Sequence, residues 1–175
     1  MHSNLVEKYL GELEACASQG SILDLACGQG RNGLFLANKG LSVTFADRSE
    51  TSLEQVSSAL SSIKSTSHTW LIDLEVPDPN PFEGYVFSAA LVFRYLHRPL
   101  IPKLINAITP GGIIIYETFT LENRQFGRPN NPDFLLEAGE LGDWFKGWET
   151  LHYFEGILPE PDRAVAQIVC RKPYN

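Results

Sequence analysis

The sequence is short of cysteine, of basic residues and of long apolar runs. Its 175 residues include three cysteines, which stand in separate predicted elements and lack the C-x-x-C spacing typical of zinc and redox sites. A small, odd number of thiols is typical of a reducing compartment. We therefore expect a cytoplasmic location and no metal site. No apolar run reaches the roughly 18 residues that a membrane helix needs, so we expect no membrane partner.

Positive charge is scarce as well. The chain has 14 Lys and Arg against 21 Asp and Glu, which gives a net charge of −7 at pH 7. Affinity for nucleic acid comes mainly from basic side chains that neutralise phosphates. The charge balance therefore argues against a nucleic-acid partner, although a local basic patch is compatible with it.

Apolar runs and helical patterns alternate along the chain, which predicts a single α/β domain over residues 1–175. The spacing of Leu5, Val6, Tyr9, Leu10 and Leu13 predicts an amphipathic helix within residues 1–20, and not a signal peptide. The other predicted helices cover residues 31–39, 49–63, 100–108 and 135–145. A first strand starts at residue 22, and further strands are predicted over 41–46, 68–74, 85–92, 113–118, 148–155 and 164–171, the last two as an antiparallel hairpin.

Residues 119–132, FTLENRQFGRPNNP, are polar and lack a periodic pattern. A connection of this length inside a compact domain is usually functional or disordered. We expect a long loop here that lies over the substrate side of the domain.

Gly28, Gly30 and Gly33 follow the first predicted strand and open the next predicted helix. This G-x-G-x-x-G pattern usually binds a dinucleotide pyrophosphate on the N–H groups of a helix N-terminus. Asp24, in the strand itself, argues against that ligand, because a carboxylate beside a pyrophosphate adds like-charge repulsion. The same acid would attract a positively charged ligand, such as S-adenosylmethionine with its ammonium and sulfonium groups.

The run ILDLACGQGRNGLFL at residues 22–36 resembles the first motif of the class I S-adenosylmethionine-dependent methyltransferases. It is most similar to the small tellurite-resistance-type and quinone-biosynthesis-type members. The resemblance implies a Rossmann-like, seven-stranded mixed sheet in which only the last strand is antiparallel, with helices on both faces. It also implies S-adenosylmethionine as the cofactor and methyl transfer as the activity.

The end of the fourth predicted strand bears on the methyl acceptor. Members of this family that methylate the amino groups of nucleic-acid bases carry an Asn/Asp-Pro-Pro-aromatic run there, whereas this chain reads SAALVFRYLH. The chain also shows no appended recognition domain for a large substrate. A small-molecule methyl acceptor is therefore expected.

The ligand-binding edge of an open α/β sheet lies at the carboxyl ends of its strands. Asp47 stands 19 residues after Gly28, a spacing at which an acid reaches the ribose of either a nicotinamide dinucleotide or S-adenosylmethionine. The resemblance implies that Asp24 and the glycine loop lie near the methionine part, that Asp47 binds the ribose, and that Asp73 binds the adenine amino group. The expected cofactor-binding residues are Asp24, Ala26, Gly28, Gly30, Arg31, Asn32, Asp47, Arg48, Asp73, Leu74 and Ala89.

The resemblance also implies where Arg48 and Ala89 lie relative to the cofactor. Each of the three acids could instead have a purely structural role. Arg48 is expected beside the adenine, and Ala89 at the end of the fourth strand beneath the cofactor. Asp24 could instead bond loop amides and organise the turn. Asp47 could be only a turn residue or the N-cap of the following helix, and Asp73 could stabilise the proline-rich turn after the third strand.

Methyl transfer is an in-line displacement that mainly needs alignment in a dry pocket. It needs a general base only where the nucleophile must lose a proton. We expect this chemistry at the ends of the fourth and fifth strands, where the catalytic candidates are His97, Glu117 and Tyr116. The candidate substrate-binding residues, whose arginines could hold an anionic acceptor, are Arg94, Tyr95, Phe119, Arg124 and Arg128.

Two other functions stay open. The glycine pattern also fits an NAD(P)-dependent oxidoreductase, which Asp24 disfavours. The chain could also be a methyltransferase-like domain that binds the cofactor and serves as a regulator or partner without turnover, since no unmistakable catalytic residue is present. Function follows the site grafted on a fold, so the acceptor itself is not predicted.

Overall fold

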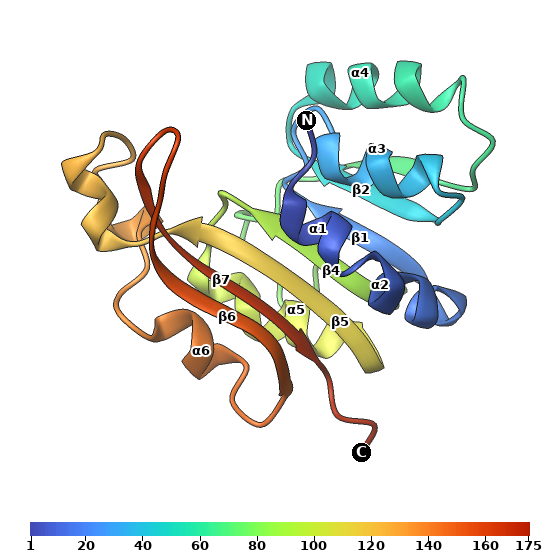
Figure 1. The fold of residues 1–175 in the computed structure, drawn as a ribbon. Helices are drawn as coiled ribbons and strands as arrows, with labels where there is room; N and C mark the ends of the chain where they lie inside the picture. Colours follow the sequence, from blue (N-terminus) through green and yellow to red (C-terminus); the bar gives the residue numbers. More distant parts are fainter.

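The computed structural model describes all residues, 1–175, as a seven-stranded sheet with helices on both faces (Figure 1). The strands are β1 (Ser21–Leu25), β2 (Val43–Asp47), β3 (His68–Leu71), β4 (Phe87–Phe93), β5 (Ile108–Phe119), β6 (Glu149–Leu158) and β7 (Arg163–Arg171). The α-helices are α1 (Asn4–Lys8), α2 (Leu10–Cys16), α3 (Arg31–Asn38), α4 (Glu50–Leu60), α5 (Ile101–Ala107) and α6 (Glu140–Trp144). Short 3₁₀ helices are η1 (Ala17–Gln19), η2 (Arg98–Leu100), η3 (Leu121–Gln125) and η4 (Pro132–Phe134).

The strand order is β3-β2-β1-β4-β5-β7-β6. Neighbouring strands from β3 to β5 are parallel, and β7 is antiparallel to both β5 and β6. This confirms the predicted seven-stranded mixed sheet in which only the last strand is antiparallel. The order reverses between β1 and β4, and ligands bind at such a switch point in open α/β sheets.

Alternation of side chains along the central strands divides the core into two layers. One layer packs residues of α1 to α4, such as Leu13 and Val56, against one face of the sheet. The other packs residues of α5 and α6, such as Leu104 and Leu141, against the opposite face. Six of the seven residues of β4 are buried, as expected of a strand covered on both faces.

Two predicted helices differ from the observed ones. The N-terminal helix is interrupted at Tyr9 into α1 and α2, and both segments still bury their apolar face. The helix predicted over residues 135–145 begins only at Glu140. The physical reason is that Leu136 is extended: its N–H donates to the carbonyl of Phe119, and its own carbonyl accepts from Leu121.

The fifth strand begins at Ile108 and not at Ile113, so it includes the Pro110-Gly111-Gly112 segment that precedes the predicted strand. This segment stays in the sheet because Gly111 donates to the carbonyl of Lys172 and Lys172 donates back to Gly112. The polar stretch over residues 119–132 is also more ordered than expected. It contains η3, and it is held to the β7 strand by the Asn123 side chain, which accepts from the N–H of Ala164 at 2.9 Å.

Two findings bear on the expected environment of the chain. None of its helices combines the length and the apolar character that a bilayer crossing requires. Cys16, Cys27 and Cys170 are all free thiols, of which Cys16 and Cys170 are buried.

The glycines of the β1–α3 loop serve packing as well as the turn. A Cβ at Gly33 would lie 2.4 Å from the ring of Phe45 and 2.7 Å from a carboxylate oxygen of Asp24. A Cβ at Gly30 would lie 2.8 Å from Val56, and the φ of Gly30 is +71°. A Cβ at Gly28 would meet nothing within 4 Å. Gly30 and Gly33 therefore allow α3 to approach β2, and only Gly28 faces open space.

We expect Gly33→Ala to lower the free energy of unfolding by about 1–3 kcal/mol, because the added methyl group has no space against Phe45. Urea unfolding of the two proteins measures this difference. The matched control is Gly11→Ala in α2, where a Cβ meets nothing within 4 Å and an exposed helical alanine should stabilise by up to about 1 kcal/mol. Equal stability of the Gly33→Ala protein and the unsubstituted protein would contradict the packing role.

Candidate functional site

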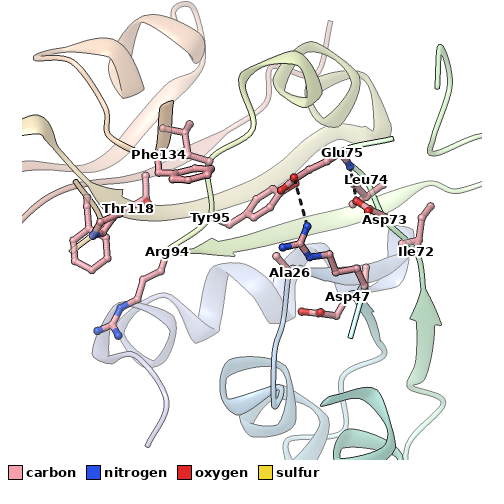
Figure 2. A pocket seen from close by; sticks show the side chains of 15 residues that line it. Ala26, Asp47, Ile72, Asp73, Leu74, Glu75, Arg94, Tyr95, Thr118 and Phe134 are labelled. Atoms are coloured by element: carbon pink, nitrogen blue, oxygen red, sulfur yellow. Dashed lines mark hydrogen bonds and ion pairs between the residues drawn. The ribbon is translucent and has the colours of Figure 1, made fainter. Parts of the chain in front are cut away.

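A cavity of about 350 Å³ opens at the carboxyl ends of the parallel strands (Figure 2). Its size and its mixed apolar and polar walls are typical of a small-molecule site. It is lined by Ala26, Ala46, Asp47, Arg48, Ile72, Asp73, Leu74, Glu75, Arg94, Tyr95, Leu96, Thr118, Phe119, Pro129 and Phe134. Eight predicted residues are among them: Ala26, Asp47, Arg48, Asp73, Leu74, Arg94, Tyr95 and Phe119.

The acidic side of the cavity comes from the ends of β2 and β3 (Figure 2). Asp47 Oδ2 accepts from the N–H of Gly28, and its Oδ1 accepts from the N–H of Ser49, both at 2.8 Å. Asp73 Oδ1 accepts from the N–H of Glu75 at 3.0 Å. Both acids therefore organise a turn, which agrees with the structural roles considered for them as alternatives. Both acids also line the cavity. A carboxylate has about four acceptor positions, so each acid retains capacity for a ligand.

An ion pair links the ends of β2 and β3 at this side. Arg48 Nη1 lies 3.6 Å from Glu75 Oε2, and the two side chains are 66% and 38% exposed. Pairs with this exposure contribute little to stability because solvent screens them. The pair is therefore free to rearrange when a ligand enters.

The other side of the cavity is largely aromatic and apolar. Tyr95 follows β4, Phe119 ends β5, and Pro129 and Phe134 come from the connection between β5 and α6. Burial, together with the nearby acids Glu75 and Asp73, raises the pKa of the Tyr95 phenol. Tyr95 is therefore protonated at neutral pH, so it can donate a hydrogen bond but cannot act as a base.

Two cavity residues have strained backbone. Ala26 and Arg94 have φ of +52° and +55°, and they are two of only three non-glycine residues with positive φ in the chain. Such conformations are costly for residues with a Cβ and occur preferentially at functional sites. Arg94 also places its guanidinium 5.7 Å from the centre of the Phe119 ring.

Asp24 does not line the cavity, so the expectation that it faces the ligand cleft is not met. Its side chain is 4% exposed, and its Oδ2 accepts from the N–H of Gly33 at 2.9 Å. Gly30, the N-cap residue of α3, offers no side chain, so Asp24 satisfies a free N–H of the first helical turn in its place. The alternative interpretation, that this acid organises the turn, fits these contacts.

Burial raises the pKa of Asp24 to about 7, and this effect outweighs the Gly33 N–H and the positive charge of Arg31, which both lower it. The other carboxylate oxygen, Oδ1, makes no hydrogen bond within the protein, and it is not among the fully buried side-chain atoms that lack a partner. An acid retained at such a cost in an otherwise apolar strand is typical of a functional site.

The loop amides argue against a pyrophosphate ligand. Cys27 donates to the carbonyl of Ala46, Gly28 to Asp47, Gly30 to the carbonyl of Cys27, and Gly33 to Asp24. A dinucleotide site needs such N–H groups for its phosphates. Here the protein itself bonds these four N–H groups, two of them to carboxylates.

Five further residues of the predicted cofactor set also lie outside the cavity lining: Gly28, Gly30, Arg31, Asn32 and Ala89. Arg31 is exposed at the start of α3, whereas Asn32 is buried and accepts from the N–H of Ser3 at 2.8 Å. The prediction that Ala89 ends the fourth strand is wrong. β4 continues through Leu91 and Val92 to Phe93, so Ala89 is fully buried in mid-strand between Ile22 and Ile113.

The three catalytic candidates lie outside the cavity as well. Tyr116 is fully buried, and its hydroxyl donates to the carbonyl of Tyr95 at 2.8 Å. Glu117 accepts from the Gln167 side chain at 2.6 Å, and alternation along β5 turns it away from the face that holds Tyr116. His97 lines a separate neighbouring cavity beside Leu74 and Glu75.

The two arginines of the long connection are also separate from the cavity. Arg124 is exposed and donates to the carbonyl of Asn130 at 3.1 Å, and Arg128 is exposed next to Pro129. The sequence analysis missed several lining residues, among them Glu75, Thr118, Pro129 and Phe134. Thr118 directly follows the predicted residue Glu117, and Glu75 directly follows Leu74, so their positions in the sequence could have indicated them. No sequence signal indicates Phe134, because it reaches the site only through the folding of the connection between β5 and α6.

Comparisons with known proteins show the family and the fold of the chain. The family model described as tellurite resistance protein TehB matches residues 2–167. The probable S-adenosyl-L-methionine-dependent methyltransferase TehB of Haemophilus influenzae is 30% identical over 142 residues, which are 78% of this chain and 48% of that protein. The chain therefore spans about half the length of the curated relatives it matches.

Solved structures show the same fold. The crystal structure of TehB from Haemophilus influenzae superposes with a TM-score of 0.74 at 23% identity, over 98% of this chain and 62% of that one. The N-methyltransferase NodS from Bradyrhizobium japonicum WM9 superposes with a TM-score of 0.66 at 14% identity, over 95% of each chain.

We expect Asp24→Asn to become progressively more stable than the unsubstituted protein as pH rises from about 5 to 7. The folded protein holds a proton on Asp24 up to about pH 7, whereas an unfolded aspartate releases it near pH 3.9. The contribution of Asp24 to the free energy of unfolding is therefore most favourable below about pH 4, and it is lost as pH rises toward 7. Asparagine does not ionise, so the difference in unfolding free energy should grow by about 1 kcal/mol per pH unit.

Urea unfolding of both proteins at several pH values measures this difference. The control is Asp162→Asn, which replaces an exposed acid in the β6–β7 turn and should show no such trend. Parallel pH profiles for Asp24→Asn and the unsubstituted protein would show that the carboxylate is ionised in the folded state without cost.

Proposed function

Because this chain belongs to the TehB family of tellurite resistance proteins, whose model matches residues 2–167, we propose that it transfers a methyl group from S-adenosylmethionine to a small-molecule acceptor. The observation that carries this proposal is the position of Asp47. Its carboxylate ends β2, bonds the Gly28 amide of the β1–α3 loop and faces the cavity at the sheet's switch point.

The chemistry of the cavity fits this cofactor. Asp47 has acceptor capacity left for the two ribose hydroxyls, and Asp73 for the adenine amino group. The apolar side chains of Ile72 and Leu74 flank Asp73 in the lining and suit a planar, weakly hydrated ring. The acids on this side attract a cation, and the loop amides occupied by the protein leave little for a phosphate.

We place Asp24 beneath this site as a positioning residue. It fixes the first turn of α3 through the Gly33 N–H, and α3 follows directly on the loop whose Gly28 amide is bonded to Asp47. Its effect on the ligand is therefore carried by the loop, and not by a contact with the cavity.

S-adenosylmethionine, when bound, supplies a methyl group on a positively charged sulfur, which leaves as a neutral thioether. The residues of this chain have the tasks of holding the acceptor in line and of excluding water. Phe119, Phe134 and Pro129 provide apolar walls for this purpose, and Thr118 and Tyr95 provide hydroxyl groups that can orient the acceptor.

The mechanism proposed here uses no histidine and no tyrosinate as a base. His97, Glu117 and Tyr116 do not line the cavity, and Tyr95 remains protonated at neutral pH. An acceptor that is already deprotonated, or that has a lone pair and no proton to lose, fits this site best.

The absence of His97, Glu117 and Tyr116 from the cavity lining keeps a second function open. A domain that binds the cofactor and regulates a partner without turnover would also need none of these three residues there. The oxidoreductase alternative is disfavoured by the occupied loop amides. The three free thiols support the proposal of a reducing, cytoplasmic location.

We expect S-adenosylhomocysteine to bind the purified protein in a calorimetric titration and NADH not to bind. Asp47→Asn should weaken S-adenosylhomocysteine at least about tenfold, because a neutral amide loses charge-assisted hydrogen bonds to the ribose. Asp162→Asn, far along the chain in the β6–β7 turn, is the control and should bind as the unsubstituted protein does.

Turnover separates the enzyme from the regulator. The protein is incubated with methyl-labelled S-adenosylmethionine and a panel of thiols, oxyanions, carboxylates and phenols, and methylated product is measured. Product from any of them supports the proposed transferase. Cofactor binding without product from any of them would favour the regulatory function, and binding of NADH alone would overturn the proposal.

A further inference from the structure

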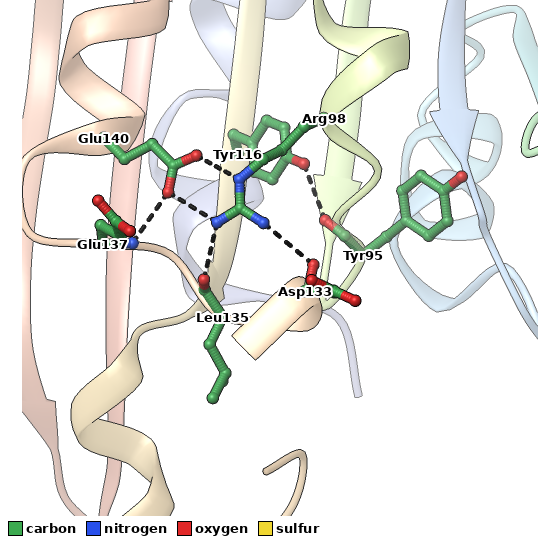
Figure 3. Close-up of polar contacts among 7 residues, drawn as sticks. All are labelled: Tyr95, Arg98, Tyr116, Asp133, Leu135, Glu137 and Glu140. Atoms are coloured by element: carbon green, nitrogen blue, oxygen red, sulfur yellow. Dashed lines mark hydrogen bonds and ion pairs between the residues drawn. The ribbon is translucent and has the colours of Figure 1, made fainter. Parts of the chain in front are cut away.

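The guanidinium of Arg98 bonds the Glu140 carboxylate and the backbone carbonyls of Asp133 and Leu135 (Figure 3). Arg98 begins η2, directly after the loop that carries Tyr95 and Leu96 into the cavity. Its Nε and Nη2 donate to the two carboxylate oxygens of Glu140 at 2.5 and 2.9 Å. This two-point geometry is the strongest arrangement available to an arginine and a carboxylate.

The same guanidinium also holds the backbone of the segment that supplies Phe134. Nη1 donates to the carbonyl of Asp133 at 3.2 Å, and Nη2 donates to the carbonyl of Leu135 at 2.9 Å. These carbonyls stand on either side of Phe134, whose side chain lines the cavity although it is 49% exposed. Arg98 thus fixes the position of Phe134 through the residues before and after it.

Glu140 extends this network to the following turn. Its Oε2 also accepts from the N–H of Glu137 at 2.9 Å. Partial burial raises the pKa of Glu140, but the hydrogen bond and charge of Arg98 outweigh this effect, so its pKa lies below the usual value. The carboxylate therefore remains ionised, and the pair persists at neutral pH.

The loop on the other wall is fixed separately. The buried hydroxyl of Tyr116 donates to the carbonyl of Tyr95 (Figure 3), so this loop has an anchor in the core. The segment before Leu135 has no such anchor in the core; besides Arg98, the exposed Arg124 side chain holds it by donating to the carbonyl of Asn130 at 3.1 Å. Leu136 is bonded to β5, whereas residues 129–134 contact the β4 loop only through Arg98 among the hydrogen bonds of the structure.

We infer that Arg98 is a positioning residue for the acceptor side of the cavity: it holds Phe134 against the β4 loop and so sets the affinity for the methyl acceptor. The effect on acceptor affinity, the acceptor role, rests on the proposed function. The holding of the Phe134 segment, the mechanical role, does not rest on it, and the two roles are tested by different measurements. Arg98 itself touches neither the cavity lining nor the acidic side where the cofactor is placed.

Hydrogen exchange on the full chain tests the mechanical role. Arg98→Gln and Arg98→Lys should accelerate exchange in a peptide that covers residues 130–137 at least about tenfold, since the carbonyl contacts and the two-point pair are lost. Lysine retains the charge but cannot reproduce the planar fork. Glu140→Gln retains a hydrogen-bond acceptor and both carbonyl contacts, so its effect should be smaller than that of Arg98→Lys.

The control is Arg171→Gln, which breaks the exposed Arg171–Glu149 pair at the other end of β7. It should leave exchange over residues 130–137 unchanged. Urea midpoints of all variants are measured in parallel, so that local loosening is distinguished from global destabilisation. Unchanged exchange in Arg98→Lys at an unchanged midpoint would overturn the inference.

Kinetics and binding test the acceptor role, with benzenethiol as the probe. Arg98→Lys should raise the KM for benzenethiol several-fold and change kcat less, while the affinity for S-adenosylhomocysteine stays within about twofold. An equal loss of affinity for S-adenosylhomocysteine would show a general structural effect and would overturn the acceptor role. If benzenethiol is not methylated, its binding to the complex with S-adenosylhomocysteine is measured by calorimetry, and equal affinity in both proteins contradicts the inference.

The two proposals fail in different ways. If the unsubstituted protein does not bind S-adenosylhomocysteine, the proposed function fails, while exchange over residues 130–137 still decides whether Arg98 holds the segment. If the cofactor analogue binds and exchange is unaffected by Arg98→Lys, the proposed function stands and the inference about Arg98 fails.

Discussion

The bond from the Gly28 amide to the Asp47 carboxylate is the constraint on which the candidate site depends. It joins the loop after β1 to the end of β2, at the place where the strand order reverses. Because the acid accepts from the loop and from Ser49 at once, its position is fixed before any ligand arrives. A preorganised carboxylate avoids the ordering cost that a mobile one would incur on binding.

A second acid stabilises the same loop from below. Asp24 takes the place of an N-cap side chain for α3, and close approach of α3 to β2 is possible because Gly30 and Gly33 lack a Cβ. The glycine pattern is therefore explained mainly by packing against Phe45 and Val56, and only Gly28 faces open space. A dinucleotide-binding motif has the same glycine spacing, but its loop N–H groups bind phosphates. In this chain, Gly28 and Gly33 donate to the carboxylates of Asp47 and Asp24.

The side of the cavity that we propose for the acceptor is held by a different kind of contact. Its walls come from the end of β5 and from a connection that has little regular structure, so side-chain contacts, and not strand pairing, fix its geometry. Arg98 supplies those contacts with one guanidinium that bonds a carboxylate and two carbonyls. This division matches a domain whose cofactor side is determined by the sheet and whose acceptor side can vary through loops.

The sequence by itself determined the fold class, the strand–helix order and most of the acidic side of the cavity. Those features follow from local patterns: apolar periodicity, the glycine motif and acids at the ends of strands, where topology brings them together. It did not determine which face of a strand end each side chain takes, which is why Glu117 was misplaced, and it did not determine where β4 ends, which is why Ala89 was misplaced. Only the tertiary structure decided that Asp24 bonds Gly33 beneath the loop and that Arg98 holds the segment of Phe134, because those contacts join residues whose proximity depends on how the elements pack.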